Sequence, residues 1–560
     1  MSEPATGPTS IDLLVVGAGP TGLMLALQLA RRGLRPLIVD RNPGPARETR
    51  ALGVQARTLE IYARLGLAGR ALELGTRATG AQLWVEGRRR ARVPLGDIGR
   101  DLSPFPFLLI LGQDDNEALL REALAGHGVE VRWNTELVGL TSGADGVTAT
   151  LQRTGGGPTE PIEARYLAGC DGSRSAVRER LGIEFAGAPY EQVFFVADTR
   201  VSGPMTVGEL NVYLFHDGFH LFFPMRGAGH WRVVGILPPG LRGRDDLDFD
   251  AVRPTLHEEA GGERLVFREC TWFSTYRIHH RRAARFRQGR CFLLGDAAHI
   301  HSPVGAQGLN TGLQDAYNLA WKLALVLGGR VGGEAAEALL ATYAAEREPV
   351  AERLLKTTDQ AFRFVIATGG FGGFFRLRVM PRVLALAMRS ERLRRLAFRT
   401  ISQVGIRYPR SPLSQAPPGG PANAPRGGPA AGDRFPWTRL TFTPGGVPED
   451  LFARLDDTRF TLLVFGQPVP PAIGGTCPAD LLTVLVVPDD PANARETDRL
   501  RVPRPSFYLL RPDGHVGLAG SRLGAEPIAR YLTERVGLRP AGELSAARHP
   551  EPDGGPPCST

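Results

Sequence analysis

The sequence predicts an α/β fold, and two patterns of apolar residues carry this prediction. Ile11–Val16 has the length of a buried parallel strand, Thr21–Arg32 has the apolar spacing of a helix, and Arg35–Val39 reads as a second strand. The chain therefore begins with a βαβ unit, the unit from which parallel sheets are built. Farther along, apolar and polar residues alternate in Gln192–Val201 and Leu210–Met225, which predicts antiparallel strands.

The length and the composition along the chain predict more than one domain. A chain of 560 residues is too long for one ordinary domain. Helical spacing extends from Asn310 to about Arg399, and Pro412–Gly432 is rich in Pro, Gly and Ala, as linkers are. Strand-like runs and a helix follow this linker, and the polar tail 546–560 is expected to be disordered.

The charge comes almost entirely from arginine. The formal net charge is +9, and only Lys322 and Lys356 are lysines among the 67 basic residues. Codon usage in a GC-rich genome explains such an excess, because Ala, Gly and Pro are abundant as well. The alternative is an anionic partner such as nucleic acid, although basic patches that bind nucleic acid usually mix lysine with arginine.

The cysteines and the N-terminus bear on location. The five cysteines are widely spaced and include no CxxC pair, so neither a disulfide framework nor a zinc site is indicated and no metal is expected. The first ten residues lack the basic region of a signal peptide, and no apolar run reaches the ~20 residues needed to span a bilayer. We expect a cytoplasmic protein without a membrane partner.

A glycine-rich turn follows the first predicted strand. The residues from Gly17 to Gly22 read GAGPTG, a GxGxxG pattern between a strand and a helix. Its glycines permit a tight turn and the close approach of a pyrophosphate, which the helix N-terminus attracts. Asp40 ends the second strand, at the place where an acid accepts hydrogen bonds from a ribose. Together these features predict a Rossmann-like dinucleotide site, without separating NAD from FAD.

A second motif lies in Cys291–Leu323. A short apolar strand leads to Gly295-Asp296, and an acid at a strand end can bind sugar or ribityl hydroxyls. The loop Gly305–Asn310 then opens a helix, whose positive end favours a nearby negative charge.

Together with Arg165–Arg178, which contains Asp171-Gly172, these motifs resemble those of the class A FAD-dependent monooxygenases, the p-hydroxybenzoate hydroxylase family. All three motifs occur in the family's order. The segment Leu510–Val516 is similar to the thioredoxin-like appendage of family members that hydroxylate polyketides and phenols. With Cys477 as the lone cysteine of this region, a redox role for it is not expected.

The resemblance implies an FAD-binding domain over 10–185 and 285–410, and a middle β-sheet substrate domain over 186–284 inserted into it. A linker over 411–432 and a thioredoxin-like domain over 433–545 would follow. The residues matched to the cofactor are Gly17, Gly19, Pro20, Thr21, Gly22, Asp40, Arg41, Arg50, Gln113, Asp171, Gly295, Asp296, Pro303, Gly308, Leu309 and Asn310.

Several of these matches have a simpler explanation. Arg41 and Arg50 can be ordinary surface arginines, Gln113 can merely begin its helix, and Asp171 can serve only its turn. His299 and His301 flank the flavin loop and read as packing residues rather than catalysts. Pro303 would line the space shared by flavin and substrate.

The activity that the resemblance implies is aromatic hydroxylation. NADPH or NADH would reduce FAD, and a flavin C4a-hydroperoxide formed with O2 would hydroxylate a phenolic or polyketide ring. Baeyer–Villiger oxygenation or epoxidation of a polyketide is the alternative within flavoenzymes, and a basic nucleic-acid-binding or assembly protein is the alternative outside them. No side-chain base is identified, and the protein is expected to be a monomer or homodimer.

The substrate would lie between the flavin and the middle sheet, which directs attention to Asn211–Pro224. The candidate wall residues are Tyr213, Phe215, His216, Phe222 and Phe223. Their alternation describes the core face of a strand equally well.

Overall fold

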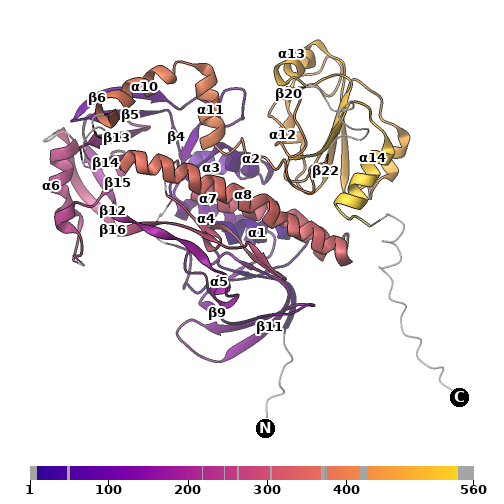
Figure 1. Cartoon of the computed structure of the whole chain (residues 1–560), viewed down its shortest axis with the longest axis horizontal. Helices are drawn as coiled ribbons and strands as arrows, with labels where there is room; N and C mark the ends of the chain where they lie inside the picture. The colour runs from indigo at the N-terminus through magenta and orange to yellow at the C-terminus, as the bar shows by residue number, and fades with distance from the viewer. Residues whose placement is uncertain are drawn as a thin grey trace, which may run out of the picture. The chain divides into compact units, whose positions relative to one another are not determined.

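The computed structural model describes residues 9–46, 51–216, 218–244, 246–260, 264–302, 305–366, 373, 375–415 and 427–539. Arg50, Pro303 and the tail 546–560 lie outside these residues, as does 416–426 of the expected linker. The chain divides into two compact units, one of Met1–Ala320 with Tyr343–Ile406, the other of Trp321–Thr342 with Arg407–Thr560. Figure 1 shows their elements along the chain.

A parallel sheet forms the centre of the first unit. Strand β1 (Thr9–Val16) lies between β11 (Thr159–Gly169) and β2 (Leu37–Val39), parallel to both. Strands β8 (Val131–Arg132) and β18 (Cys291–Leu293) extend this order in parallel at its two sides. Helix α1 (Pro20–Ala30) is buried from Gly22 to its end. The predicted βαβ start is therefore confirmed.

Further elements surround this sheet. Strands β9 (Thr135–Ser142), β10 (Val147–Arg153) and β17 (Arg287–Gln288) join it by antiparallel pairing. The other elements that lie wholly or partly in the first unit, outside its second sheet and α6, are β3 (Gly53–Val54), β4 (Thr76–Ala78), β7 (Leu108–Ile110), α2 (Ala56–Arg64), α3 (Ala68–Leu74), α4 (Gln113–Ala125), α5 (Ala176–Arg180), α7 (Gly308–Leu327), α8 (Gly333–Ile366), α10 (Met380–Ala387) and α11 (Glu391–Ile401).

The second sheet of this unit is the predicted middle sheet. Its strands, in spatial order, are β19 (His299–Ile300), β16 (Val266–Ala283), β12 (Phe185–Ser202), β15 (His230–Ile236), β14 (Gly218–Pro224), β13 (Glu209–Phe215), β5 (Gly80–Val85) and β6 (Arg88–Pro94). All neighbours are antiparallel except β13 and β5. Strands β5 and β6 come from earlier in the chain than the interval 186–284, so the sheet is larger than the sequence indicates.

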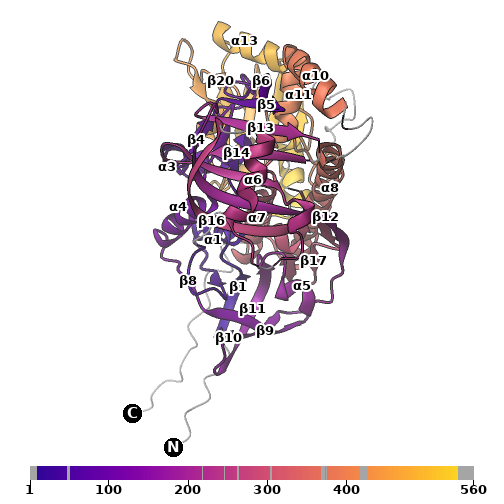
Figure 2. The ribbon, with the colours of Figure 1, turned by 90° about the vertical axis from the view of Figure 1, so that its left-hand side faces the viewer.

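Helix α6 (Phe249–Ala260) covers one face of the middle sheet, as Figure 2 shows. Its residues Phe249, Val252 and Leu256 belong to the same buried cluster as Tyr213 and Phe222 of the sheet. The face that carries this cluster is called the outer face below, and the opposite face the inner face. The antiparallel middle sheet inserted into an α/β domain confirms the predicted fold class.

The second unit is built on a mixed four-stranded sheet. Strand β22 (Phe460–Phe465) is parallel to β23 (Leu482–Val487) and antiparallel to β24 (Ser506–Leu510), which pairs with β25 (Val516–Gly520). Helices α13 (Pro491–Leu500) and α14 (Ala525–Arg530) belong to the same unit, which also holds β20 (Arg439–Leu440), β21 (Glu449–Asp450) and α12 (Leu451–Arg454). Its identity as a thioredoxin-like domain stays a prediction.

The segment 321–342 groups with this second unit although it precedes the expected linker. The ring of Trp321 packs edge-on against Phe460, with 5.9 Å between the ring centroids. No helix among the described residues is both long enough and apolar enough to cross a membrane.

Candidate active site

The turn from Gly17 to Gly22 leaves an open place at one glycine. Gly17 has φ +103°, and a Cβ there would lie 2.4 Å from the carbonyl oxygen of Cys170. A Cβ on Gly22 would lie 2.0 Å from the carbonyl oxygen of Gly17. A Cβ on Gly19 would meet no atom within 4 Å, and Gly19 is the N-cap of α1, which has no side-chain cap and Pro20 in its first turn. Two glycines therefore serve the fold, whereas Gly19 leaves room for a ligand at a helix N-terminus.

Asp40 closes this turn from the side. Its Oδ2 accepts a hydrogen bond of 2.7 Å from the backbone N–H of Ala18, and its Oδ1 accepts one of 2.8 Å from Asn42. The adjacent Arg41 is exposed, and its carbonyl oxygen accepts a hydrogen bond from the hydroxyl of Thr154. The structure thus brings the predicted ribose-binding acid against the glycine turn.

Thr21 joins the GxGxxG turn to the motif in Cys291–Leu323. A Cβ on Gly295 would lie 2.7 Å from the hydroxyl oxygen of Thr21, and one on Gly312 would lie 2.4 Å from it. Two glycines therefore make the space that Thr21 fills between the turn before α1 and the start of α7. Asp296, next to Gly295, is exposed in a single 3₁₀ turn.

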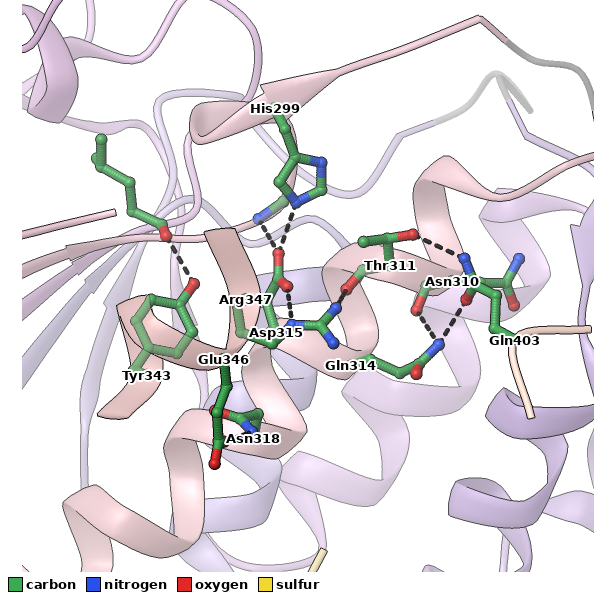
Figure 3. A network of polar contacts seen from close by, with 12 residues as sticks. His299, Asn310, Thr311, Gln314, Asp315, Asn318, Tyr343, Glu346, Arg347 and Gln403 are labelled. Carbon is green, nitrogen blue, oxygen red and sulfur yellow. Dashed lines mark hydrogen bonds and ion pairs between the residues drawn. The ribbon is translucent and has the colours of Figure 1, made fainter. Parts of the chain in front are cut away.

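A buried carboxylate fixes the Gly295 turn from beneath (Figure 3). Oδ2 of Asp315 accepts hydrogen bonds from the backbone N–H of Gly295 at 3.0 Å and from Nε2 of His299 at 2.8 Å. Its Oδ1 accepts one of 2.6 Å from Nε of Arg347. Burial by itself would raise the pKa of Asp315, but the charges of Arg347 and His299 hold it below its ordinary value. The turn is thereby held by an ionised group.

The first turn of α7 is held in the same network. The Asn310 amide nitrogen donates to the carbonyl oxygens of Gly53 and Ala306, and its Oδ1 accepts from the N–H of Gln55 and the hydroxyl of Thr58. Since all of these bonds stay within the protein, the side chain of Asn310 is fully used, and the first backbone amides of α7 are the groups left for a ligand. Gln55 and Thr58 were not found from the sequence, which shows no motif at these positions.

The Asp171-Gly172 motif lies against the Gly295 turn. Arg178 donates hydrogen bonds to the carbonyl oxygens of Ala297 at 2.9 Å and Ser173 at 3.0 Å. Oδ2 of Asp171 accepts from the N–H of Val177, while the buried Oδ1 has no hydrogen-bond partner among the described residues. Burial raises the pKa of Asp171. Oδ1 of Asp171 is thus an acceptor without a partner, close to the GxGxxG turn and the Gly295 turn, and a hydroxyl group of a ligand would satisfy it.

Gln113 begins α4, where its amide donates a hydrogen bond of 2.8 Å to Glu117. Burial raises the pKa of Glu117, and the negative charge of Asp40 contributes in the same direction. Gln113 therefore lies at the end of the site that Asp40 occupies. His301 lies at the other end, beside Gly308, and its Nδ1 is 2.8 Å from the carbonyl oxygen of Ser302.

His301 is a neutral acceptor at ordinary pH. Because a carbonyl oxygen only accepts, Nδ1 carries the proton and Nε2 is left as an acceptor. Nε2 is buried and has no partner among the described residues, and burial lowers the pKa of His301 to about 4. His299 is buried and hydrogen-bonded to Asp315, so in this structure it supports the fold around the Gly295 turn.

The middle sheet separates the substrate candidates by face. Tyr213 and Phe222 lie in the buried cluster under α6, where the Tyr213 ring stacks on Trp84 with 5.3 Å between centroids. Tyr213 and Phe222 therefore lie in the core of the sheet, which is the alternative explanation of their alternation in the sequence. Phe215 follows Tyr213 on the same face, with its ring 4.7 Å from that of His220, and His216 is exposed in the turn after β13.

Phe223 points to the inner face. It packs with Leu210 against Leu52 and Ile110, next to Gly53, where a Cβ would lie 2.3 Å from the Cβ of Ala306. Three further apolar residues of the inner face are half-buried although they lie on central strands, namely Val212, Leu221 and Val234. Cross-strand partners share a face, so the register alone assigns these three to the side of Phe223.

The comparisons with known proteins agree with this geometry. Residues 10–358, well over half of the chain, match the family model described as "FAD binding domain". The chain belongs to the FAD-dependent aromatic monooxygenases. The 6-methylpretetramide 4-monooxygenase of Streptomyces rimosus is 35% identical to it over 99% of both chains.

Two solved structures show the same fold in other members of this family. The flavin-dependent monooxygenase PieE, solved with FAD and substrate, has a TM-score of 0.80 at 26% identity and covers 95% of this chain and 100% of its own. The anhydrotetracycline hydroxylase OxyS of Streptomyces rimosus has a TM-score of 0.75 at 29% identity, with the same coverage. Membership of an enzyme family decides against the non-enzyme alternative, a basic nucleic-acid-binding or assembly protein.

The residues of this monooxygenase fit FAD. The open place at Gly19 and the uncapped helix N-terminus suit a pyrophosphate, and Asp40 lies within reach of the same turn. The Gly295–Asp296 turn and the first amides of α7 lie on the other side of Thr21. FAD is thus the cofactor, and three motifs that are far apart in sequence are joined by side chains at one place.

Proposed function

We propose that this monooxygenase hydroxylates a phenolic or polyketide aromatic substrate with O2 and NAD(P)H. The inner face of the middle sheet would be the surface on which the aromatic ring rests. The observation that carries this proposal is the half-buried state of Val212, Leu221, Phe223 and Val234 on central strands. Val212 and Leu221 pack against the buried cluster of this face, and the part of each side chain that stays accessible beside the cluster supports a binding surface.

The cofactor-binding roles proposed for the chain follow from its contacts. Gly17, Gly19 and Gly22 with Pro20 and Thr21 would hold the pyrophosphate. Asp40 and Gln113 would serve the adenosine and ribityl ends, with Arg41 and Arg50 near the adenine. Asp171, Gly295 and Asp296 would bind sugar or ribityl hydroxyls, and the amides of Gly308, Leu309 and Asn310, with Pro303 near the ring, would receive the flavin. When bound and reduced, FAD supplies the reaction of O2 that delivers one oxygen atom to the substrate.

The protein's own part in the reaction is positioning and exclusion of water. Apolar residues of the inner face hold the ring, and Phe223 with Leu52 and Ile110 seals the edge next to the loop of Ala306. His301 is neutral near pH 7, so it does not act as a proton donor there, and it holds its Nδ1 proton on the carbonyl oxygen of Ser302. A phenol with a low pKa of its own would suit a site of this kind.

The names of two relatives support a multi-ring substrate. The relatives named above act on 6-methylpretetramide and on anhydrotetracycline according to their names. An extended apolar inner face suits such flat ring systems better than a single small phenol.

Product analysis tests the proposal. Holoenzyme is incubated with NADPH or NADH, ¹⁸O-labelled O2 and a panel of phenols, anthraquinones and tetracyclic polyketides. We expect at least one compound to stimulate NAD(P)H oxidation and to gain one labelled hydroxyl group on an aromatic carbon. A labelled oxygen inserted into the carbon skeleton, or no stimulation by any compound, would contradict aromatic hydroxylation.

The domain limits 10–185 with 285–410, 186–284 and 433–545 belong to the same proposal. We infer that the first two divisions bind FAD and substrate and that the last serves assembly, since its Cys477 has no CxxC partner. A cytoplasmic location and a monomer or homodimer are proposed with it.

A further inference from the structure

Exposed apolar side chains gather on two successive helices of the first unit. Eleven large apolar residues are exposed in the described part of the chain, and six of them lie from Phe375 to Ile401. Helices α10 and α11 occupy this stretch and lie next to each other in Figures 1 and 2. Such crowding of exposed apolar residues marks a contact surface.

Each of the two helices leaves two aliphatic side chains exposed to solvent. Helix α10 exposes Val383 by 54% and Leu386 by 66%, on the side opposite the buried Pro381. Helix α11 exposes Leu393 by 44% and Leu396 by 62% in the same spacing of three residues. Residues three apart lie on one face of a helix. These four aliphatic residues are called the outer ridge below.

Arginines flank the outer ridge. Arg382 lies beside it on α10, and Arg389 follows the end of that helix. On α11, Arg392 and Arg399 lie along one side of Leu393 and Leu396, because residues seven apart share a face of a helix. All four are exposed, and none of them forms an ion pair with another described residue. Glu391 is the only acidic residue of the two helices, and it already pairs with Arg395 at 3.1 Å.

We propose that the outer ridge docks on a lipid surface that carries anionic headgroups. Exposed aliphatic side chains with exposed arginines along one side match a helix lying in a bilayer interface, where the apolar residues enter the acyl boundary and the guanidinium groups bind phosphates. Protein-binding hot spots are instead poor in Leu and Val, which make up the outer ridge. This docking departs from the sequence expectation of no membrane partner, and it can be tested without the substrate proposed above.

The function of such docking would be access to apolar compounds. A flat multi-ring aromatic compound partitions from water into a bilayer, because its apolar surface leaves water there. A monooxygenase held at the bilayer surface would meet a higher local concentration of such a compound than one in bulk solution.

Vesicle flotation with the holoenzyme tests the docking. Vesicles of phosphatidylcholine alone are compared with vesicles that contain about 40% phosphatidylglycerol, at low and high salt. We expect flotation with the anionic vesicles only, and its loss at high salt. The double variant Leu393→Asp/Leu396→Asp is expected to lose binding at least about tenfold, and Arg392→Gln/Arg399→Gln to lose it by a similar factor.

Two controls keep the test specific. Val447→Asp changes another exposed apolar residue, in the second unit, and should float as the wild type does. FAD content and circular dichroism of every variant should match the wild type. Equal flotation of the wild type and the ridge variants would overturn the proposal, because vesicle binding would then depend only on the net charge of the protein. A wild-type dimer that the ridge variant converts to a monomer, without vesicle binding, would assign the ridge to a second copy of the chain and overturn it as well.

Discussion

The molecule buries the same trio of side chains twice, once in each compact unit. In the first unit, Asp315 binds His299 and Arg347, and all three are almost completely buried. In the second, Asp513 accepts from Arg511 and lies 3.3 Å from His515, and these three are buried as well. In both, burial opposes ionisation of the aspartate, and its cationic neighbours nevertheless lower its pKa.

The two clusters differ in what they hold. Asp315 gathers groups from separate segments and accepts the backbone N–H of Gly295, in the turn that the cofactor motif forms. Asp513 gathers groups from the single turn between β24 and β25, and Arg511 lies 5.4 Å from the ring centroid of Trp321. One cluster thus fixes the turn of the Gly295-Asp296 motif and the other fixes a hairpin. A buried ionic trio is therefore not by itself a sign of function, and the backbone that it holds decides the matter.

The largest expected effect comes from removing each aspartate's charge. Asp315→Asn and Asp513→Asn should each lower the free energy of unfolding by about 3–5 kcal/mol, since an arginine is left without its buried partner. FAD affinity should separate them. In folded protein, Asp315→Asn should weaken FAD by at least about tenfold, and Asp513→Asn by less than about twofold.

Denaturant unfolding and flavin fluorescence titration measure these two quantities. A matched stability loss with an FAD affinity unchanged in both variants would remove the distinction between the clusters. An equal loss of FAD affinity in both would remove it too.

Two glycines, one in each unit, extend the comparison between a position at the cofactor motif and a position in a packed core. Gly19 faces open space, whereas a Cβ on Gly517 of the second unit would lie 2.1 Å from the hydroxyl oxygen of Tyr531. Gly19→Ala should leave the unfolding free energy of the apoprotein within about 0.5 kcal/mol of wild type and weaken FAD about tenfold. Gly517→Ala should cost about 1–3 kcal/mol of stability and leave FAD binding intact. If Gly19→Ala lowered the free energy of unfolding and left FAD affinity unchanged, Gly19 would not be part of the cofactor site.

Local sequence pattern was enough to propose the cofactor turns, but not to find the side chains that hold them. GxGxxG, Asp40 and Gly295-Asp296 each combine a strand end with residues that a phosphate or sugar requires, so local pattern sufficed. Asp315, Arg347, Gln55 and Thr58 follow no local motif, because they act through contacts made only when distant segments fold together.

The middle sheet shows how much the alternation of apolar and polar residues can predict. Period-two alternation predicted the strands around Asn211–Pro224, and β13 and β14 are found there. It could not tell which face meets α6, because both faces are rich in apolar residues. The partners β5 and β6 were missed because parallel pairing of β13 with β5 joins segments more than a hundred residues apart.

Acid pH distinguishes the first unit through His301. Its pKa is lowered to about 4 in the folded protein, whereas an unfolded histidine titrates near 6.5. The unfolded chain therefore binds the proton first, so stability is complete above about pH 6.5 and falls as the pH drops toward 4. By this linkage the loss at pH 5 is about 1–2 kcal/mol, with the half-buried state of the residue taken into account.

His301→Gln should flatten this slope between pH 7 and pH 5, as unfolding experiments at several pH values can measure. The aspartates act in another window, since their lowered pKa values make stability fall only below about pH 4. A slope that persists in the variant would assign the titration to another group.

The smallest effects compare the two faces of the middle sheet. Phe223→Leu should raise KM for a multi-ring substrate about fivefold, roughly 1 kcal/mol, with stability nearly unchanged, because a contact of the inner face is reduced. Tyr213→Phe removes a buried hydroxyl that has no hydrogen-bond partner among the described residues. Deleting such a group is expected to leave KM unchanged and stability equal or slightly higher. Steady-state kinetics with the substrate found in the panel measure both. A rise in KM for Tyr213→Phe with no change for Phe223→Leu would place the substrate on the outer face.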